Sequence, residues 1–286
     1  MRLGYNTNGL AFHRWPDSID LLIEAGYSSV AITLDHHCLN PFQNERALKE
    51  EIQVVREKLA AAKMISVIET GARFLLDPRQ KHEPTLITAD ADQRQRRIDF
   101  LCRAVDIADQ LGSSAVSFWA GVPSFEASES GLAEAWLIEG CQQVTNYAEA
   151  RNVLVAFEPE PGMLIESFDQ FQHLKAAIPS PAFGLTVDIG HVQCVEAKPI
   201  ADYLLHWGDL IYNIHIEDMV RGVHEHLRFG EGEIDFVPVL KTLDDVGFTG
   251  GLNIELSRHS HMAPEVVTES FEFLNRIAIE AGINLA

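Results

Sequence analysis

The chain has 286 residues, of which 47% are hydrophobic, and it carries a formal net charge of −20 with an isoelectric point near 4.9. This length and apolar content suit one α/β barrel with a sizeable core, and no apolar run approaches the ~20 residues of a membrane span. Tracking a nucleic-acid backbone requires a basic surface, so the acidic balance argues against DNA or RNA as a partner.

The start of the chain and the spacing of its cysteines indicate the compartment. The opening MRLGYNTN passes directly into a strand-like pattern and has no hydrophobic segment of the secretory type. The cysteines are scattered without CxxC spacing, at Cys38, Cys102, Cys141 and Cys194. We therefore expect free thiols and a cytoplasmic location, while assembly of the chain into a homo-oligomer stays open.

Eight short β-type runs alternate with helical patterns along the whole chain. The predicted strands are Arg2–Asn8, Ser29–Asp35, Ile65–Thr70, Ala115–Ala120, Val153–Glu158, Phe183–Asp188, Ile211–Glu217 and Gly251–Leu256. Between them, apolar residues recur at three- and four-residue steps, as in Ile52, Val55 and Leu59. Eight βα units predict a single-domain (β/α)8 TIM barrel over residues 1–286. An open doubly wound sheet is the alternative, but the first turn lacks GxGxxG.

A long loop follows the third predicted strand, from Gly71 to about Asp90. It carries several charged or polar side chains that could face a ligand, namely Arg73, Asp77, Arg79 and His82. Because long βα loops of a barrel usually form the wall or lid of the pocket, we expect this loop to border the site.

The last four predicted strands share a feature at their carboxyl ends. In Ile211–Glu217, Asn213 and His215 lie on the face opposite Ile214, and the same alternation can be followed in the other three strands. Each inward face then ends in a group that can bind a metal: Glu158, Asp188, His215 and Glu255. Because the carboxyl ends of parallel barrel strands converge on one rim, we expect these four groups to meet there.

Three carboxylates at one rim would repel one another and raise each other's pKa unless a cation is present. One imidazole with three carboxylates suits Mn²⁺ best, with Mg²⁺, Co²⁺ or Zn²⁺ as further candidates, and differs from the sulfur-rich shells of structural zinc. We therefore predict one divalent ion. The open alternative is a rim of solvated acids beside a core histidine that bonds a backbone carbonyl.

The segments VAFEPEPG, TVDIGH, NIHIEDMVR, HLRFGEGEIDF and NIELS, in this order, resemble the xylose isomerase-like barrel superfamily. That superfamily contains ketose 3-epimerases, hydroxypyruvate isomerases, inosose and dehydroshikimate dehydratases and apurinic endonucleases. The resemblance implies that Glu158, Asp188, His215 and Glu255 match the metal ligands of the sugar epimerases. It also implies that His191 and Arg221 contact the substrate.

The sequence departs from these relatives at several positions. Leu164 stands where the epimerases have a further glutamate, and Glu160 is a candidate substitute. The strand ends that carry histidines in the endonucleases correspond to Glu69 and Trp119, and we expect Trp119 to shape the substrate pocket. His224-x-His226 resembles loop ligands of the endonucleases, so these two histidines either hold a second metal or hydrogen-bond the substrate.

The predicted chemistry is proton abstraction beside a carbonyl, with Glu158 and Glu255 as the acid and base pair. The chain is thus interpreted as a metal-dependent isomerase or epimerase of carbohydrate metabolism that acts on a small sugar-like substrate, without a nucleic-acid or membrane partner. A dehydratase of the inosose or dehydroshikimate type is the alternative. An endonuclease-like hydrolase and a non-catalytic barrel are less favoured. None of the lysines ends a predicted strand, which argues against Schiff-base chemistry.

Overall fold

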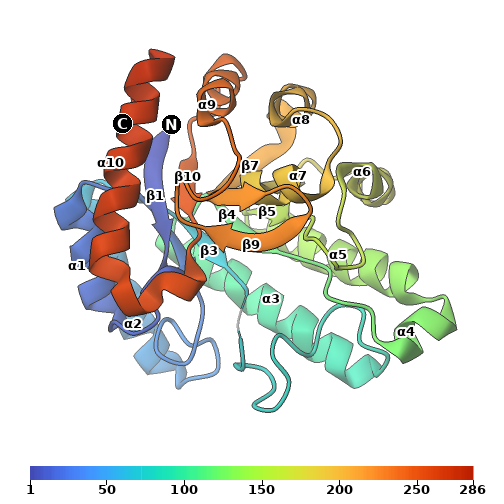
Figure 1. Cartoon of the computed structure of the whole chain (residues 1–286). Coiled ribbons are helices and arrows are strands. Elements are labelled where there is room, and N and C mark those ends of the chain that lie inside the picture. Colours follow the sequence, from blue (N-terminus) through green and yellow to red (C-terminus); the bar gives the residue numbers. More distant parts are fainter. Residues whose placement is uncertain (72, 286) are drawn as a thin grey trace.

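Eight parallel strands close into a barrel (Figure 1). The computed structural model describes residues 1–71 and 73–285. The barrel strands are β1 (Arg2–Asn6), β2 (Ser29–Thr33), β3 (Ile65–Glu69), β4 (Ala115–Phe118), β5 (Leu154–Phe157), β6 (Phe183–Asp188), β7 (Ile211–Ile216) and β10 (Gly251–Ile254). They follow chain order around the barrel, and β1 closes it on β10, with Arg2 opposite Gly251. The predicted single-domain (β/α)8 TIM barrel is confirmed.

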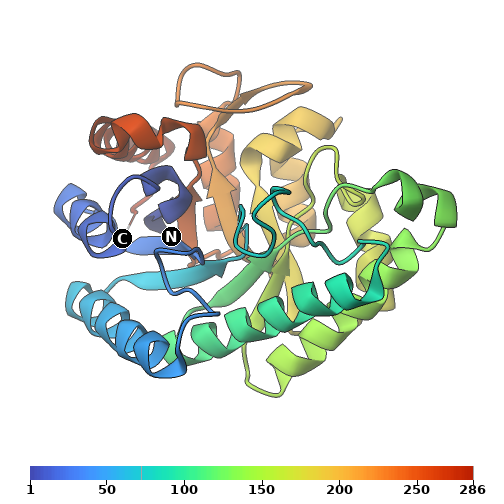
Figure 2. The ribbon, with the colours of Figure 1, turned by 90° about the horizontal axis from the view of Figure 1, so that it is seen from below.

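Helices connect the strands and surround the barrel (Figure 2). They are α1 (Trp15–Ala25), α2 (Glu45–Ala62), α3 (Ala91–Leu111), α4 (Phe125–Ser130), α5 (Ala133–Glu149), α6 (Phe168–Ala177), α7 (Ile189–Val195), α8 (Ile200–Trp207), α9 (Phe236–Asp245) and α10 (Ala263–Ala281), with short 3₁₀ helices η1 (Thr7–Leu10), η2 (Gly208–Leu210) and η3 (Ser257–Met262). Local signals set their limits: Asn44 caps the first N–H groups of α2, and Gly26 ends α1 at a φ of 99°. Within the described part of the chain, no helix has both the length and the apolar content for a membrane crossing.

Most of the strands end earlier than the sequence predicted. β1 stops at Asn6 because the Asn6 side chain accepts a hydrogen bond from the N–H of Asn8 (3.1 Å), which turns the following residues into η1. β4 stops at Phe118, two residues before its predicted end. The residues beyond these ends therefore belong to the loops at the rim of the barrel.

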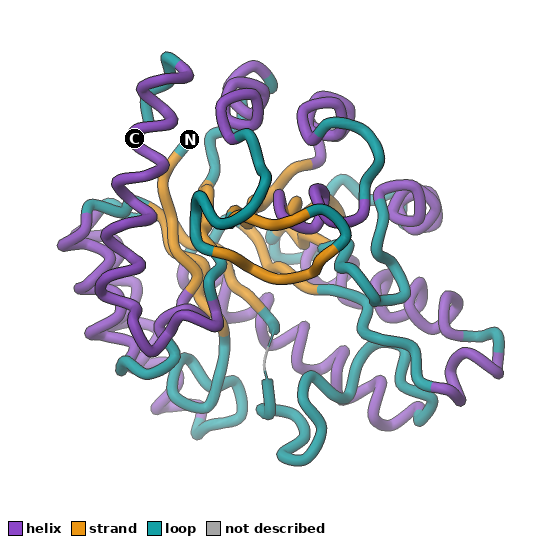
Figure 3. The backbone as a smooth tube through the Cα atoms, in the orientation of Figure 1, coloured by secondary structure: helices purple, strands orange, loops and turns teal. Residues whose placement is uncertain are grey.

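The segment after β7, which the sequence predicted as a loop, contains a small hairpin. β8 (Asp218–Val220) and β9 (Val223–Leu227) pair in antiparallel fashion, and the hairpin lies in front of the barrel strands in Figure 3. Because side chains two apart on a strand share one face, the hairpin gives His224 and His226 a common direction.

A cluster of four phenylalanines packs between the barrel wall and helix α6. Phe118, Phe157 and Phe183 come from adjacent strands, and Phe171 comes from α6; all four are fully or almost fully buried. The ring centroids of Phe118 and Phe157 are 5.6 Å apart, and those of Phe171 and Phe183 are 5.9 Å apart. The outward phase that the alternation predicted for Phe157 is thus the one that builds the core.

The interior of the barrel, beneath the rim, is held by linked polar side chains. Ser29 donates to Asn253 at 3.0 Å, and Asn253 donates to Asn213 at 2.9 Å. On the other side, Thr186 donates to Ser117 at 2.8 Å. Because each of these buried groups has a partner, they stabilise the interior instead of costing desolvation energy, and they form a rigid floor under the rim.

We expect Phe157→Ala to lower the free energy of unfolding by about 3–5 kcal/mol, because it removes a buried ring from the centre of the cluster. Phe125→Ala is the matched control, since its ring is 79% exposed, and it should change the free energy by less than about 0.5 kcal/mol. Urea unfolding followed by circular dichroism measures both. Equal losses in the two variants would contradict the assigned core.

Candidate metal centre

A cavity of about 230 Å³ opens at the carboxyl ends of the barrel strands. Most of the residues that the sequence singled out line it: Trp119, Glu158, His191, His215, His224, His226 and Glu255. Its volume equals that of roughly eight water molecules at about 30 Å³ each, which suits a small polar ligand. A larger groove of about 1090 Å³ lies outside the barrel against α2, α3 and α5, away from these groups.

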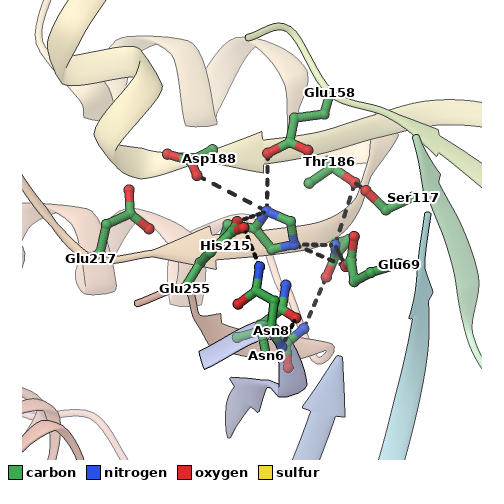
Figure 4. Close-up of polar contacts among 12 residues, drawn as sticks. Asn6, Asn8, Glu69, Ser117, Glu158, Thr186, Asp188, His215, Glu217 and Glu255 are labelled. Atoms are coloured by element: carbon green, nitrogen blue, oxygen red, sulfur yellow. Dashed lines mark hydrogen bonds and ion pairs between the residues drawn. The ribbon is translucent and has the colours of Figure 1, made fainter. Parts of the chain in front are cut away.

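The four predicted metal ligands meet at the floor of this cavity (Figure 4). One ligand atom from each of Glu158, Asp188, His215 and Glu255 can be chosen so that all lie within 4.8 Å of one another. From Nδ1 of His215, the nearest oxygens of Glu158, Glu255 and Asp188 are at 3.0, 2.9 and 4.0 Å. The geometry therefore brings together the set that the strand alternation indicated.

Asp188 is oriented by its place between a strand and a helix. It ends β6 and caps α7, since its Oδ1 accepts a hydrogen bond from the His191 N–H at 2.7 Å. Its Oδ2 is buried and has no hydrogen-bond partner among the described residues. A buried carboxylate oxygen without a donor is costly, and a cation at the centre of the cluster would satisfy it. The residues present are therefore of a kind and placement that could hold a divalent ion.

Glu69 is a member of the cluster that sequence reasoning did not assign to it. It ends β3, and its Oε1 lies 2.9 Å from Nε2 of His215 and accepts a hydrogen bond from Asn213 at 3.0 Å. An acceptor at Nε2 favours a proton on that nitrogen, which would leave Nδ1 available to a metal ion, as in metal-bound histidines. The signal was present, because Glu69 is the last residue of β3 and shares the inward face with Val67.

Asn8 is a second residue that the sequence did not indicate. Its Nδ2 donates to Oε1 of Glu255 at 2.6 Å, from the 3₁₀ helix η1 that follows β1, the barrel neighbour of β10 (Figure 4). The sequence predicted Asn8 as the last residue of the first strand but did not assign it to the site, and in the structure it lies in η1 instead. Asn8 leaves Oε2 of Glu255 as the atom that faces His215.

The electrostatics of the cluster follow from its excess of buried negative charge. Burial alone would lower the pKa of His215, but the carboxylates of Glu69, Glu158 and Glu255 raise it well above its usual value. Burial raises the pKa of Glu158 to about 8. For Glu255, burial acts in the same direction, yet the adjacent His215 charge lowers the pKa overall. The cluster therefore has to bind protons or a cation.

Glu217 extends the acidic cluster beneath the hairpin. Its carboxyl is fully buried, and burial together with the neighbouring Asp188 carboxylate raises its pKa well above the usual value. Gly190 makes the room, since a Cβ at that position would lie 2.1 Å from Oε1 of Glu217. A further group consists of Asp188, Glu217 and His226, whose ligand atoms all lie within 4.8 Å of one another.

Three histidines gather on the cavity wall beside the cluster. Ligand atoms of His191, His224 and His226 all lie within 4.8 Å of one another, and Nε2 of His224 is 3.1 Å from Nε2 of His191. Burial lowers the pKa of His191 to about 4, so its imidazole is neutral near pH 7. Neutral imidazoles can hold a second ion or hydrogen-bond a substrate, and both readings of His224 and His226 keep their geometric support.

Trp119 lies in the cavity wall, as the sequence predicted. Its ring is held from behind by the guanidinium of Arg97, which is fully buried and lies 4.6 Å from the ring centroid. The Arg97 side chain also donates to the carbonyl of Thr70 at 3.2 Å. The cation–π contact fixes the orientation of Trp119.

Arg221 is not among the residues that line the cavity, so the structure does not bring it together with the other predicted site residues. It lies in the turn between β8 and β9, is exposed, and donates to the backbone carbonyl of Glu196 at 2.5 Å. The hairpin accounts for this, because its turn carries Arg221 away from the rim while its strands bring His224 and His226 toward it.

Glu160 and Leu164, the two candidates for the position of the further glutamate, lie in different environments. Glu160 lines the cavity, and burial together with the nearby Glu158 carboxylate raises its pKa well above the usual value. Leu164 is instead packed against the hydrophobic core. This placement agrees with Glu160 as the substitute for the further epimerase glutamate.

Comparison with known proteins identifies the family. The family model described as xylose isomerase-like TIM barrel matches residues 19–277. The chain belongs to this family. A curated relative, the L-ribulose-5-phosphate 3-epimerase of Shigella flexneri serotype 5b, is 22% identical over 243 residues, which cover 85% of this chain and 82% of the relative.

Solved structures of the xylose isomerase-like family share the same barrel. A D-tagatose 3-epimerase-like protein superposes with a TM-score of 0.75 at 20% identity, covering 96% of this chain and 99% of that one. An L-ribulose 3-epimerase superposes with a TM-score of 0.77 at 15% identity, covering 98% and 95%. The chain is thus related to sugar epimerases, and the structural likeness extends over the whole barrel.

We expect Mn²⁺ to stabilise the protein through the four-residue cluster. At a hundredfold excess over Kd, one bound ion adds about 2.7 kcal/mol to the free energy of unfolding, which a thermal melt with and without Mn²⁺ detects. His215→Ala should lose this gain and lower the metal content of the purified protein. His173→Ala, an exposed histidine on α6, is the control and should retain both. A normal metal content in the His215 variant would contradict the assignment.

Proposed function

We propose that this chain is a divalent-metal-dependent isomerase or epimerase of a small sugar or related polyhydroxy carbonyl compound. The observation that supports this most is the convergence of Glu158, Asp188, His215 and Glu255 at the floor of a cavity of about 230 Å³. The sugar epimerases among its relatives support the substrate class. The whole barrel, residues 1–286, would act as one catalytic unit.

The four-residue cluster would hold the ion, for which Mn²⁺ is the first choice and Mg²⁺, Co²⁺ and Zn²⁺ are further candidates. The unpartnered Oδ2 of Asp188 and the excess of buried carboxylates support a cation there. When bound, a divalent ion acts as a Lewis acid toward the carbonyl of the substrate and stabilises negative charge that develops on its oxygen.

Glu255 and Glu158 would transfer the proton. Burial raises the pKa of Glu158 whereas the adjacent imidazole charge lowers that of Glu255, so the two carboxyls lie in the different environments that suit an acid and base pair. In our proposal, Glu255 removes the proton from the carbon beside the carbonyl to give an enediolate. The hydrogen bond from Asn8 holds the Glu255 carboxylate in place. Return of a proton to the opposite face gives epimerisation, and return to the neighbouring carbon gives isomerisation.

The wall of the cavity would bind and orient the substrate. His191, His224 and His226 offer ring nitrogens for the hydroxyl groups of the substrate, and Trp119 offers a rigid apolar face. Trp119 and His191 are buried, so the reacting end of a small ligand would be screened from bulk water. Arg221 is left out of this set because of its place on the hairpin turn.

We expect Glu255→Gln to lower turnover by about 10²–10⁴-fold, the range of a lost acid–base group, while the fold and most metal binding persist. Turnover is followed as deuterium incorporation at the carbon beside the carbonyl, by NMR in D₂O with Mn²⁺ and a panel of ketoses. Glu272→Gln, an exposed acid on α10, is the control and should match the native chain. Unchanged exchange in the Glu255 variant would remove this residue from the mechanism.

The same experiment separates the alternative function. A dehydratase would use the same proton abstraction but then expel a hydroxyl group, so its product lacks one water and absorbs in the ultraviolet. A product of unchanged mass with deuterium at the exchanged carbon supports the isomerase or epimerase. A product lighter by one water would place the chain with the dehydratases instead.

A further inference from the structure

Three cationic side chains line the outer part of the cavity, above the carboxylate floor. Arg73 and Lys81 come from the long loop after β3, and Arg258 comes from the 3₁₀ helix η3. Figure 2 shows this loop, drawn in teal, crossing in front of the barrel strands. Lys81 and Arg258 are exposed and Arg73 is half-buried, whereas Glu158 and Asp188 below them are buried. Positive and negative groups therefore occupy opposite ends of one cavity.

The two loop cations make no direct ion pair in the described part of the chain, although the charge of Lys81 opposes the rise in the pKa of the Glu160 carboxyl. Among the described residues, neither Arg73 nor Lys81 forms an ion pair with a carboxylate. Arg73 donates from Nη2 to the carbonyl of Asn8 at 2.9 Å, which anchors the guanidinium at the rim. Arg258 differs, since it pairs with Glu225 at 2.8 Å and ties η3 to the hairpin.

Arg73 and Lys81 do not serve to neutralise the carboxylates of Glu158, Asp188 and Glu255 at the floor of the cavity. The ion pairs of Glu158, Asp188 and Glu255 are all made with histidines, His191 and His215. If the loop cations served the same carboxylates, they would be drawn down into contact with them, and they are not. Their free donors instead face the space that a ligand would fill.

The negative net charge of the whole chain bears on which ligands the two loop cations bind. With a net charge of −20, the protein repels anionic ligands, so a site for one needs local cations at its entrance. Arginine offers a planar pair of donors and lysine a mobile point charge, and both suit a phosphate or carboxylate. A neutral sugar would gain little from two unpaired cations.

We propose that the substrate of this site carries an anionic group, phosphate or carboxylate, at the end opposite its reacting carbonyl, and that Arg73 and Lys81 bind that group. The proposal rests on the proposed function for the orientation of the carbonyl toward the floor. The loop gives both cations a common support, because the His82 N–H donates to the Arg73 carbonyl at 2.6 Å and so ties the two arms together. Arg258 marks the opposite edge of the same opening.

Matched substrates test the charge requirement. The probes are L-ribulose 5-phosphate, L-ribulose, and a pentulosonic acid with a terminal carboxylate, each with Mn²⁺ in D₂O. A charge-assisted hydrogen bond corresponds to about 10- to 100-fold in affinity or rate, so we expect kcat/KM for one of the two charged probes to exceed that for L-ribulose by at least this factor. The better of the two charged probes identifies the group. Equal or higher kcat/KM for L-ribulose would overturn the proposal while leaving the proposed function intact.

Variants at the loop assign the effect to these side chains. Lys81→Met should reduce the ratio of kcat/KM for the charged over the neutral probe by about tenfold, mainly through KM, and Lys81→Arg should restore most of it. Lys241→Met, an exposed lysine on α9, is the control and should leave the ratio unchanged. A ratio that does not move in the Lys81 and Arg73→Met variants would contradict the assigned role.

Binding measurements keep this proposal separate from the proposed function. Isothermal titration calorimetry of the native chain and the Lys81→Met and Lys241→Met variants with L-ribulose 5-phosphate and with the pentulosonic acid needs no turnover. Tighter binding of a charged probe by the native and Lys241 chains, without any exchange, would support the anion site and reject the isomerase. Absence of both binding and exchange for every probe would reject both.

Discussion

The site is dominated by negative charge that the fold buries at one end of the barrel. Four carboxylates lie around the imidazole of His215, namely Glu69, Glu158, Asp188 and Glu255. Charged groups in a water-poor interior are stable only when counter-charges and hydrogen bonds compensate for lost hydration. Without a metal ion, the excess of negative charge raises the pKa of His215, and burial raises that of Glu158. A divalent ion would compensate the buried negative charge more completely.

The strands hold these groups in place because parallel neighbours deliver their carboxyl ends to one level. Asp188 lies opposite His215 in the register of β6 and β7, and His215 lies opposite Asn253 in that of β7 and β10. The polar side chains below link the strands across the interior, so the ligand positions rest on hydrogen-bonded supports. Catalytic groups gain from such supports, since small displacements reduce rates strongly.

Much of this arrangement could be predicted from the sequence, for a physical reason. A period of two fixes which face each strand side chain occupies, and the parallel barrel fixes where the carboxyl ends meet, so Glu158, Asp188, His215 and Glu255 could be grouped before any coordinates were known. Glu69 follows the same rule, but it ends β3, across the barrel from His215. The pattern shared by the last four strands therefore did not indicate it. The fold itself followed from eight repeats of one unit.

Contacts that depend on loops could not be predicted in this way. Asn8 reaches Glu255 from a 3₁₀ turn, and Arg221 is directed outward by a hairpin that had no clear signal in the sequence. The family assignment narrowed the chemistry, while the fold class alone would not have done so, because barrels of this kind host many reactions. Glu160 lines the cavity while Leu164 packs against the core, so Glu160 stays the candidate for the further glutamate that the resemblance implied.

The closure of the barrel by its first and last strands has a consequence for biosynthesis. β1 has no partner on one side until β10 has been made, and Glu255 follows β10 directly. A nascent polypeptide on the ribosome therefore cannot close the barrel or complete the cluster of Glu158, Asp188, His215 and Glu255 before this last strand and Glu255 have been made. A product that stops before β10 therefore lacks both the closed barrel and the full set of predicted ligands.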